Sequence, residues 1–154
     1  MCRRRRHLAV ASTILSLAVA CSSDGFLGTP DAFPHAAATR ACGPADGPAV
    51  AIYLTTFPVE SLEPQRPYAR IAIWQPQSKL AGGSWLIAND DTAAAAWYFT
   101  GQAGFEVATH GRVTVSSVEP DTTIQGFADL TFPVAGRIRS GFRGVWISGS
   151  PLCG

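Results

Sequence analysis

The stretch AVAIYLTT, residues 49–56, indicates the fold class because apolar side chains recur in it at every second position. Successive side chains of a β-strand point to opposite sides, so Val50, Ile52 and Leu54 would lie on one face of an extended chain. ARIAIW, residues 69–74, repeats the pattern. A period of two over short stretches of this kind predicts β-strands.

Five further stretches have strand character, and turn signals rich in Gly, Pro, Asn or Asp separate nearly all of them. They are residues 84–88, 95–100, 111–118, 123–132 and 136–147. The alanine-rich residues 91–97 allow one helical turn, but the aromatic and β-branched residues that follow favour a strand. The sequence therefore predicts an all-β fold, as a single antiparallel β-sandwich or small β-barrel of about seven short strands.

The N-terminus carries a three-part export pattern. Four arginines at residues 3–6 precede an uncharged run, residues 8–20, which ends in small side chains. This run is too short to cross a bilayer, because a spanning helix needs about 20 apolar residues. We therefore expect residues 1–20 to be a signal peptide and the mature chain to have no transmembrane helix.

Residues 18–21, Ala-Val-Ala-Cys, resemble a relaxed form of the lipobox of bacterial lipoproteins. This resemblance implies that Cys21 becomes the lipidated first residue of the mature chain. It also implies anchoring in the cell envelope, and Ser22 after the lipid site resembles lipoproteins of the outer membrane of diderm bacteria. Plain secretion, with cleavage after the same small residues, remains the alternative, and export by the twin-arginine route is a weaker one.

The segment after the lipid site is rich in Ser, Gly, Pro and Ala and has no sustained period. We expect residues 21–41 to be the lipidated cysteine and a flexible tether, and residues 42–154 to be one β-domain. Cys42 and Cys153 are the cysteines left once Cys2 and the lipidated residue are set aside, and in an exported chain they most simply form a disulfide. A metal site is the alternative, but CxxC, HxH and HExxH are absent, so neither a metal nor another cofactor is expected.

The last third of the chain carries a second resemblance. GRVTVSSV at residues 111–118, GFADLTF at 126–132, Gly-Phe at 141–142 and the late Cys153 resemble a C-terminal pattern of uncharacterised bacterial lipoproteins. In that pattern a GxVTVxSV strand precedes two Gly-Phe strands joined as a hairpin, and a terminal cysteine closes the domain. The resemblance implies export, lipidation and an all-β fold, and it implies no activity.

The net charge changes sign once the signal is removed. The full chain has 12 basic and 11 acidic residues, and Arg3–Arg6 leave with the signal, whereas every acidic residue follows Cys21. The mature chain therefore has 8 basic and 11 acidic residues, a formal charge of −3. This balance disfavours nucleic acid as a partner.

Candidates for catalysis are few. His110 is the one histidine of the predicted β-domain, and Asp90 and Asp91 lie in a predicted turn, where such side chains bond to their own backbone. Asp129 lies on a predicted strand beside aromatic residues. We expect no enzyme, and the alternative is a secreted hydrolase that uses one of these carboxylates with His110.

Arg137, Arg139 and Arg143 share one strand parity, so they would point to the same side. Such a stripe suits anionic lipid headgroups or lipopolysaccharide phosphates. The alternative is an ordinary solvated face, opposite an inner side formed by Ile138, Phe142 and Trp146. The four tryptophans would either fill the core or form an exposed surface on which sugar rings stack. They are Trp74, Trp85, Trp97 and Trp146.

The sequence therefore predicts a membrane-anchored envelope lipoprotein whose β-domain is a non-catalytic interaction or structural module. Its partner would be an envelope protein or an anionic glycolipid. A small-ligand carrier with an apolar cavity is a further alternative to the hydrolase.

Overall fold

The computed structural model of the chain describes residues 33–61, 63–88, 93–101 and 103–149. Within these ranges the chain forms nine β-strands and two short 3-10 helices. The strands are β1 (His35–Cys42), β2 (Pro48–Thr55), β3 (Tyr68–Ile73), β4 (Ser84–Ala88), β5 (Ala94–Phe99), β6 (Phe105–Val107), β7 (His110–Glu119), β8 (Thr123–Phe132) and β9 (Gly136–Trp146). The 3-10 helices are η1 (Pro44–Asp46) and η2 (Gln77–Lys79).

All seven stretches predicted from the period of two are strands, with ends that differ by at most one residue. They correspond to β2, β3, β4, β5, β7, β8 and β9. The alanine-rich stretch belongs to β5 from Ala94 onward, where it pairs with β3. The all-β fold class is therefore confirmed.

Two strands were not predicted, and one of them corrects the expected tether. Residues 35–41 were expected to be flexible, but they form β1, which pairs with β2 along its whole length from His35 to Cys42. The alanine-rich sequence of β1 is a weak strand signal by itself. It is extended because strands on both sides supply hydrogen-bond partners. The other unpredicted strand, β6, has only three residues.

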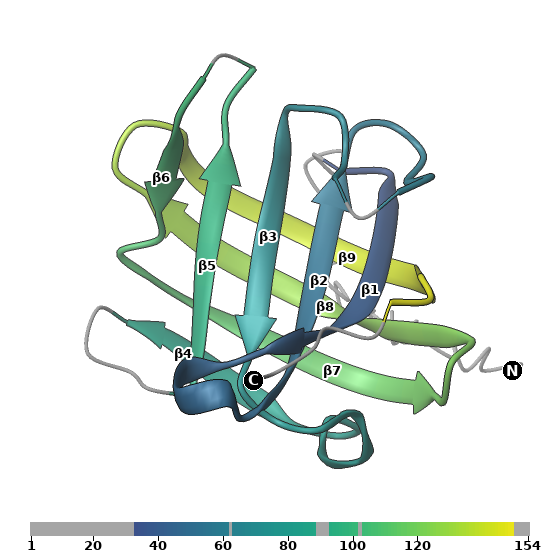
Figure 1. Cartoon of the computed structure of the whole chain (residues 1–154). Helices are drawn as coiled ribbons and strands as arrows, with labels where there is room; N and C mark the ends of the chain where they lie inside the picture. Colours follow the sequence, from purple (N-terminus) through teal and green to yellow (C-terminus); the bar gives the residue numbers. More distant parts are fainter. Residues whose placement is uncertain (1–32, 62, 89–92, 102, 150–154) are drawn as a thin grey trace, which may run out of the picture.

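The strands form a single sheet in the order β4-β7-β8-β9-β1-β2-β3-β5-β6. Every neighbouring pair is antiparallel except β1 and β9, which run parallel. The predicted antiparallel sandwich or small barrel of about seven strands is thus corrected to a nine-stranded mixed sheet curled into a half-barrel. In Figure 1 β1, β2, β3 and β5 form the front layer, and β7, β8 and β9 cross behind them at a steep angle.

A corner in the chain connects β6, at one end of the strand order, to β7, the second strand from the other end. β6 pairs with β5, and only two residues later the chain begins β7, on the other half of the sheet. At the corner the amide of Ala108 donates to the carbonyl of Ala96 (2.9 Å), and that of Thr109 donates to the carbonyl of Thr131 (2.9 Å). The two halves of the sheet are therefore joined here by a continuous, hydrogen-bonded segment.

The core lies between the two halves. The front layer contributes the inward side chains of β2 and β3, and the rear layer contributes those of β7, β8 and β9. The largest fully buried apolar residues are Val50, Ile52, Leu54, Ile71, Ile73, Leu80, Val113, Val115, Ile124, Leu130 and Phe132. Burial of each such side chain favours folding by about 1.5–3 kcal/mol, so this shared interior is the main source of stability.

A bulge in β7 depends on a glycine of the neighbouring strand. The register between β7 and β8 shifts between Val115 and Ser117, opposite Gly126. A Cβ atom at Gly126 would collide with the carbonyl oxygen of Thr114 and lie 2.6 Å from Cζ of Phe142. Glycine thus allows the backbone of β7 to approach β8 closely where the sheet bends.

Candidate functional site

The arginines of β9 point outward, as the strand parity predicts. Arg137 and Arg143 are exposed and Arg139 is half-buried, whereas Ile138 and Phe142 between them are buried. The outer side of β9 is therefore basic and its inner side belongs to the core.

The sheet register adds a fourth arginine that the sequence reasoning missed. Arg112 of β7 pairs with Asp129 of β8, and Asp129 pairs with Arg139 of β9, so these residues form one row across three strands. The next row places His110 beside Thr131 and Arg137. The sequence could have predicted which side of its strand Arg112 lies on, but its neighbours on β8 and β9 depend on the register of the sheet. We call Arg112, Arg137, Arg139 and Arg143 the guanidinium face.

Asp129 holds two of these arginines. Nε and Nη2 of Arg137 donate to the two carboxylate oxygens of Asp129 over 2.8 and 2.7 Å. Nε of Arg139 lies 3.5 Å from Oδ2 of Asp129. The hydrogen bond from Arg137 lowers the pKa of Asp129 against an opposing effect of burial, and the charges of Arg137, Arg139 and His110 lower it further. The same hydrogen bond raises the pKa of Arg137.

Positive charge is concentrated on this side of the molecule. Four of the 8 basic residues that follow Cys21 in the sequence belong to the guanidinium face. Of the two acidic residues on β7, β8 and β9, Asp129 lies among the arginines, and Glu119 lies at the far end of β7, where it accepts a hydrogen bond from Thr123 (3.2 Å). The face is therefore net positive, although the residues that follow Cys21 carry more acidic than basic side chains.

A shallow depression of about 590 Å³ lies on the outer side of β4, β7, β8 and β9. Arg112, Arg137, His110, Asp129 and Thr131 contribute its polar side chains, and Leu86 of the edge strand β4 contributes exposed apolar surface. Guanidinium groups present several N–H donors in a plane, and their geometry matches phosphate and carboxylate oxygens. The arrangement is thus suited to the binding of an anion.

The catalytic candidates are partly brought together here. His110 and Asp129 line the same depression, whereas Asp90 and Asp91 lie outside the described residues. Nδ1 of His110 lies 3.1 Å from the hydroxyl of Thr109, and both oxygens of Asp129 accept hydrogen bonds from Arg137. Both oxygens of this carboxylate are therefore engaged by a guanidinium group, which lowers its capacity to accept a proton. In the part of the chain that the structure describes, no group of three or more His, Cys, Asp or Glu residues could hold a metal ion.

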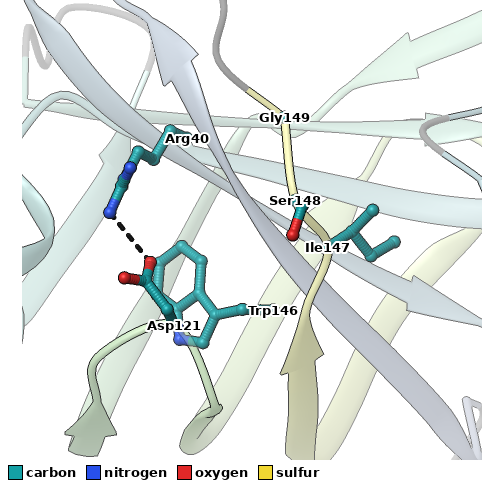
Figure 2. Close-up of a pocket in the computed structure, with 6 residues that line it drawn as sticks. All are labelled: Arg40, Asp121, Trp146, Ile147, Ser148 and Gly149. Carbon is teal, nitrogen blue, oxygen red and sulfur yellow. Dashed lines mark hydrogen bonds and ion pairs between the residues drawn. The ribbon is translucent and has the colours of Figure 1, made fainter.

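A second hollow, of about 320 Å³, lies where the end of β9 meets β1 and the turn between β7 and β8 (Figure 2). Arg40 of β1 donates to Oδ1 of Asp121 in that turn over 2.8 Å. The indole of Trp146 lies beside this pair in Figure 2 and donates from Nε1 to the carbonyl of Thr123 (3.3 Å). Because the side chains of Arg40 and Asp121 are 53% and 70% exposed, the ion pair contributes little stability.

The four tryptophans do not form one platform. Trp85 and Trp146 pack partly against the core, Trp97 lies on the outer side of β5 with the Arg70 guanidinium 5.4 Å from its ring centre, and Trp74 lies against Gly43. The outer side of the front layer instead carries a ladder of four other aromatic rings. Its ring centres are 6.1, 4.5 and 5.7 Å apart in the order Tyr53, Tyr68, Phe99, Phe105.

The remaining predicted site residues are the cysteines. Cys21 and Cys153 lie outside the described residues, so lipidation and the disulfide stay predictions. Cys42 is the last residue of β1. The amide of Ile147 donates to the carbonyl of Ala38 (2.8 Å), so the chain that follows β9 begins alongside β1 and in the same direction.

No family model, curated protein or solved structure matches this chain. Among the residues that the structure describes, no helix is both long enough and apolar enough to span a bilayer.

Proposed function

We propose that this chain is an envelope lipoprotein, anchored by lipid on Cys21, whose β-domain is a non-catalytic interaction module. The anchoring half of the proposal is supported by the N-terminal arginines, the apolar run and the lipobox-like residues that end it. Ser22 supports the outer membrane of a diderm bacterium as its location. Its partner is an envelope protein or an anionic glycolipid.

The observation that carries the interaction half is the guanidinium face. Four arginines lie on the outward side of β7 and β9, and the carboxylate between them is engaged by Arg137 and Arg139. A surface of fixed cations presented by rigid strands is suited to recognition of an anionic partner.

The structure favours this role over the two alternatives. A hydrolase would use His110 as a base with a carboxylate in reach, but Asp129 is already an acceptor for Arg137. A carrier would enclose an apolar cavity, yet the interior between the layers is filled by large side chains with no exposed surface, among them Ile52, Leu54 and Leu130.

Replacement of Cys21 tests the anchor. In the full chain Cys21→Ser should move the protein from the membrane fraction to the soluble fraction, since the thiol that would carry the lipid is lost. The matched control is Cys2→Ser, because Cys2 would leave with the signal peptide and its variant should remain with the membrane. Mass spectrometry of the N-terminal peptide should detect acyl chains on Cys21 in the wild type. An unmodified Cys21 in the wild type would contradict the proposal.

A further inference from the structure

We propose that the guanidinium face binds the phosphorylated saccharide headgroup of a lipid in the membrane to which the protein is anchored. This inference rests on the proposed function and specifies the partner of its β-domain. Three features support it: the placement of the arginines on the outer side of the rear layer, the side chains between them, and the short length of chain between the domain and the proposed anchor.

The arginines provide a site for phosphate. Arg112 and Arg139 flank Asp129 in one row, and Arg137 extends the cluster by one row along the strands. Asp129 binds Nε and Nη2 of Arg137, which fixes the plane of this guanidinium. Asp129 balances the charge of Arg137, whereas Arg112 donates to the neutral hydroxyl of Ser84, so the charge of Arg112 remains for an external anion. Phosphate, with oxygens that accept several N–H donors at once, is the ligand that Arg binds best in this geometry.

The side chains between the arginines suit a sugar. The outer positions of β4, β7 and β8 carry hydroxyl groups, and Oγ of Ser84 and Oγ1 of Thr114 lie 3.3 Å apart next to the arginine row. Arg112 donates from Nη1 to the same Ser84 hydroxyl (3.1 Å). The half-buried ring of Phe127 lies in the next row, with the guanidinium of Arg139 5.6 Å from its centre. Hydroxyls beside guanidinium groups match the hydroxyls and phosphates of a phosphorylated saccharide.

The point of entry of the chain keeps the whole domain near the membrane. Oγ of Ser140, in the middle of β9, donates to the carbonyl of Phe33 (3.4 Å), and both residues are buried. The described chain therefore begins on the inner side of β9, the strand whose outer side carries three of the arginines. Residues 21–32 connect this point to the proposed anchor, and such a length spans at most about 40 Å when fully extended. An anchored domain therefore stays within reach of lipid headgroups, which raises their effective concentration at the face.

The test uses the mature chain, residues 21–154, with Cys21→Ser so that no acyl chain contributes to binding. It is mixed with phosphatidylcholine vesicles that contain diphosphorylated lipid A, a glucosamine disaccharide with two phosphates, and bound protein is measured by flotation. We expect binding to these vesicles, and we expect Arg112→Gln with Arg139→Gln to weaken it at least about tenfold through loss of two charge-assisted contacts. The matched control is Arg70→Gln, which removes a guanidinium from the front layer and should leave binding unchanged.

Two vesicle controls separate a specific headgroup site from general attraction. Phosphatidylcholine alone should bind no protein, and phosphatidylglycerol at the same charge density should bind far less than lipid A does. Equal binding to phosphatidylglycerol would overturn the saccharide part of the inference. Absence of binding to lipid A, or unchanged binding by the folded double variant, would overturn the inference as a whole. Either result leaves the anchor test at Cys21 unaffected, so the two proposals fail separately.

Discussion

The front layer (β1, β2, β3, β5 and β6) and the rear layer (β4, β7, β8 and β9) differ on their outer sides, although both line the same core. The outer side of the front layer carries the aromatic ladder, with the Arg66 guanidinium 5.2 Å from the ring centre of Phe99. Burial within this ladder raises the pKa of the Tyr68 hydroxyl. On the outer side of the rear layer, guanidinium and hydroxyl groups surround Asp129 instead.

This difference shows that packing in the core restricts the inward side chains of both layers more than their outward side chains. Inward side chains must fill a shared interior, so both layers place aliphatic residues there. Outward side chains do not meet across this interior, so the two layers can differ in chemistry there, although Ala51 and Tyr53 on the outer side of β2 are also buried. Arg66 and Arg70 lie over rings in the front layer. In the rear layer Arg137 and Arg139 lie against a carboxylate, and Arg139 also lies over the ring of Phe127. The stability of this protein should therefore depend on the inner sides, and its binding on the outer sides.

The largest expected effect comes from the inner side of the rear layer. Leu130 has no exposed surface, so Leu130→Ala should lower the free energy of unfolding by about 2–5 kcal/mol through lost burial and a residual cavity. Thr131→Ala is the matched control, because Thr131 is the next residue along β8 and its side chain points outward. This variant should change the free energy of unfolding by less than about 0.5 kcal/mol. Urea unfolding of the mature chain measures both. Equal effects would contradict the division into stabilising and binding sides.

The junction between the layers should give the next largest effect. β1 belongs to the front layer, and the chain after β9 runs beside it, so a disulfide between Cys42 and Cys153 would fasten the two layers together. Its reduction, or Cys153→Ser, should lower the free energy of unfolding by about 2–4 kcal/mol without loss of the fold. Thermal unfolding with and without reductant measures the effect. Two reactive thiols in the denatured, unreduced protein would refute the bridge.

The smallest effect should come from the outer side of the rear layer. The pKa of Asp129 is lowered in the folded state, so its pairing with Arg137 stabilises the fold above the ordinary pKa of an aspartate. This contribution is lost as the pH falls below about 4 and through the lowered value. Asp129→Asn should therefore cost less than about 1 kcal/mol at neutral pH and nothing in strong acid.

Arg137→Gln removes the other partner of the same ion pair. It should remove the same pH-dependent contribution to the free energy of unfolding as Asp129→Asn does. Unfolding free energies of both variants and the wild type, measured across the acidic range, check this. A loss of stability in Asp129→Asn that stays constant down to strong acid would mean that Asp129 acts through packing and not through its charge.

Much of the fold followed from local pattern. Alternation of apolar residues located seven strands to within one residue at each end, and it placed Ile138 and Phe142 on the inner side of β9 with the arginines opposite. Alternation can do this because it reflects the burial of one face of a strand, and this burial selects an apolar residue at each inward position whichever strand lies alongside. For the same reason the sequence predicted that Arg137, Arg139 and Arg143 lie on one side of their strand.

The tertiary structure alone decided which strands are neighbours. The alanine-rich β1 has little strand propensity and is extended because β2 and β9 pair with it, and its parallel pairing with β9 joins segments more than a hundred residues apart. Likewise Arg112 joins the other arginines only through the register of β7 with β8. The alternation of apolar and polar residues is a property of each strand's own sequence. The neighbours of a strand and its register depend on how the whole sheet curls around a common core. For this reason the sequence by itself determined which residues face inward, and the tertiary structure decided which outward residues meet.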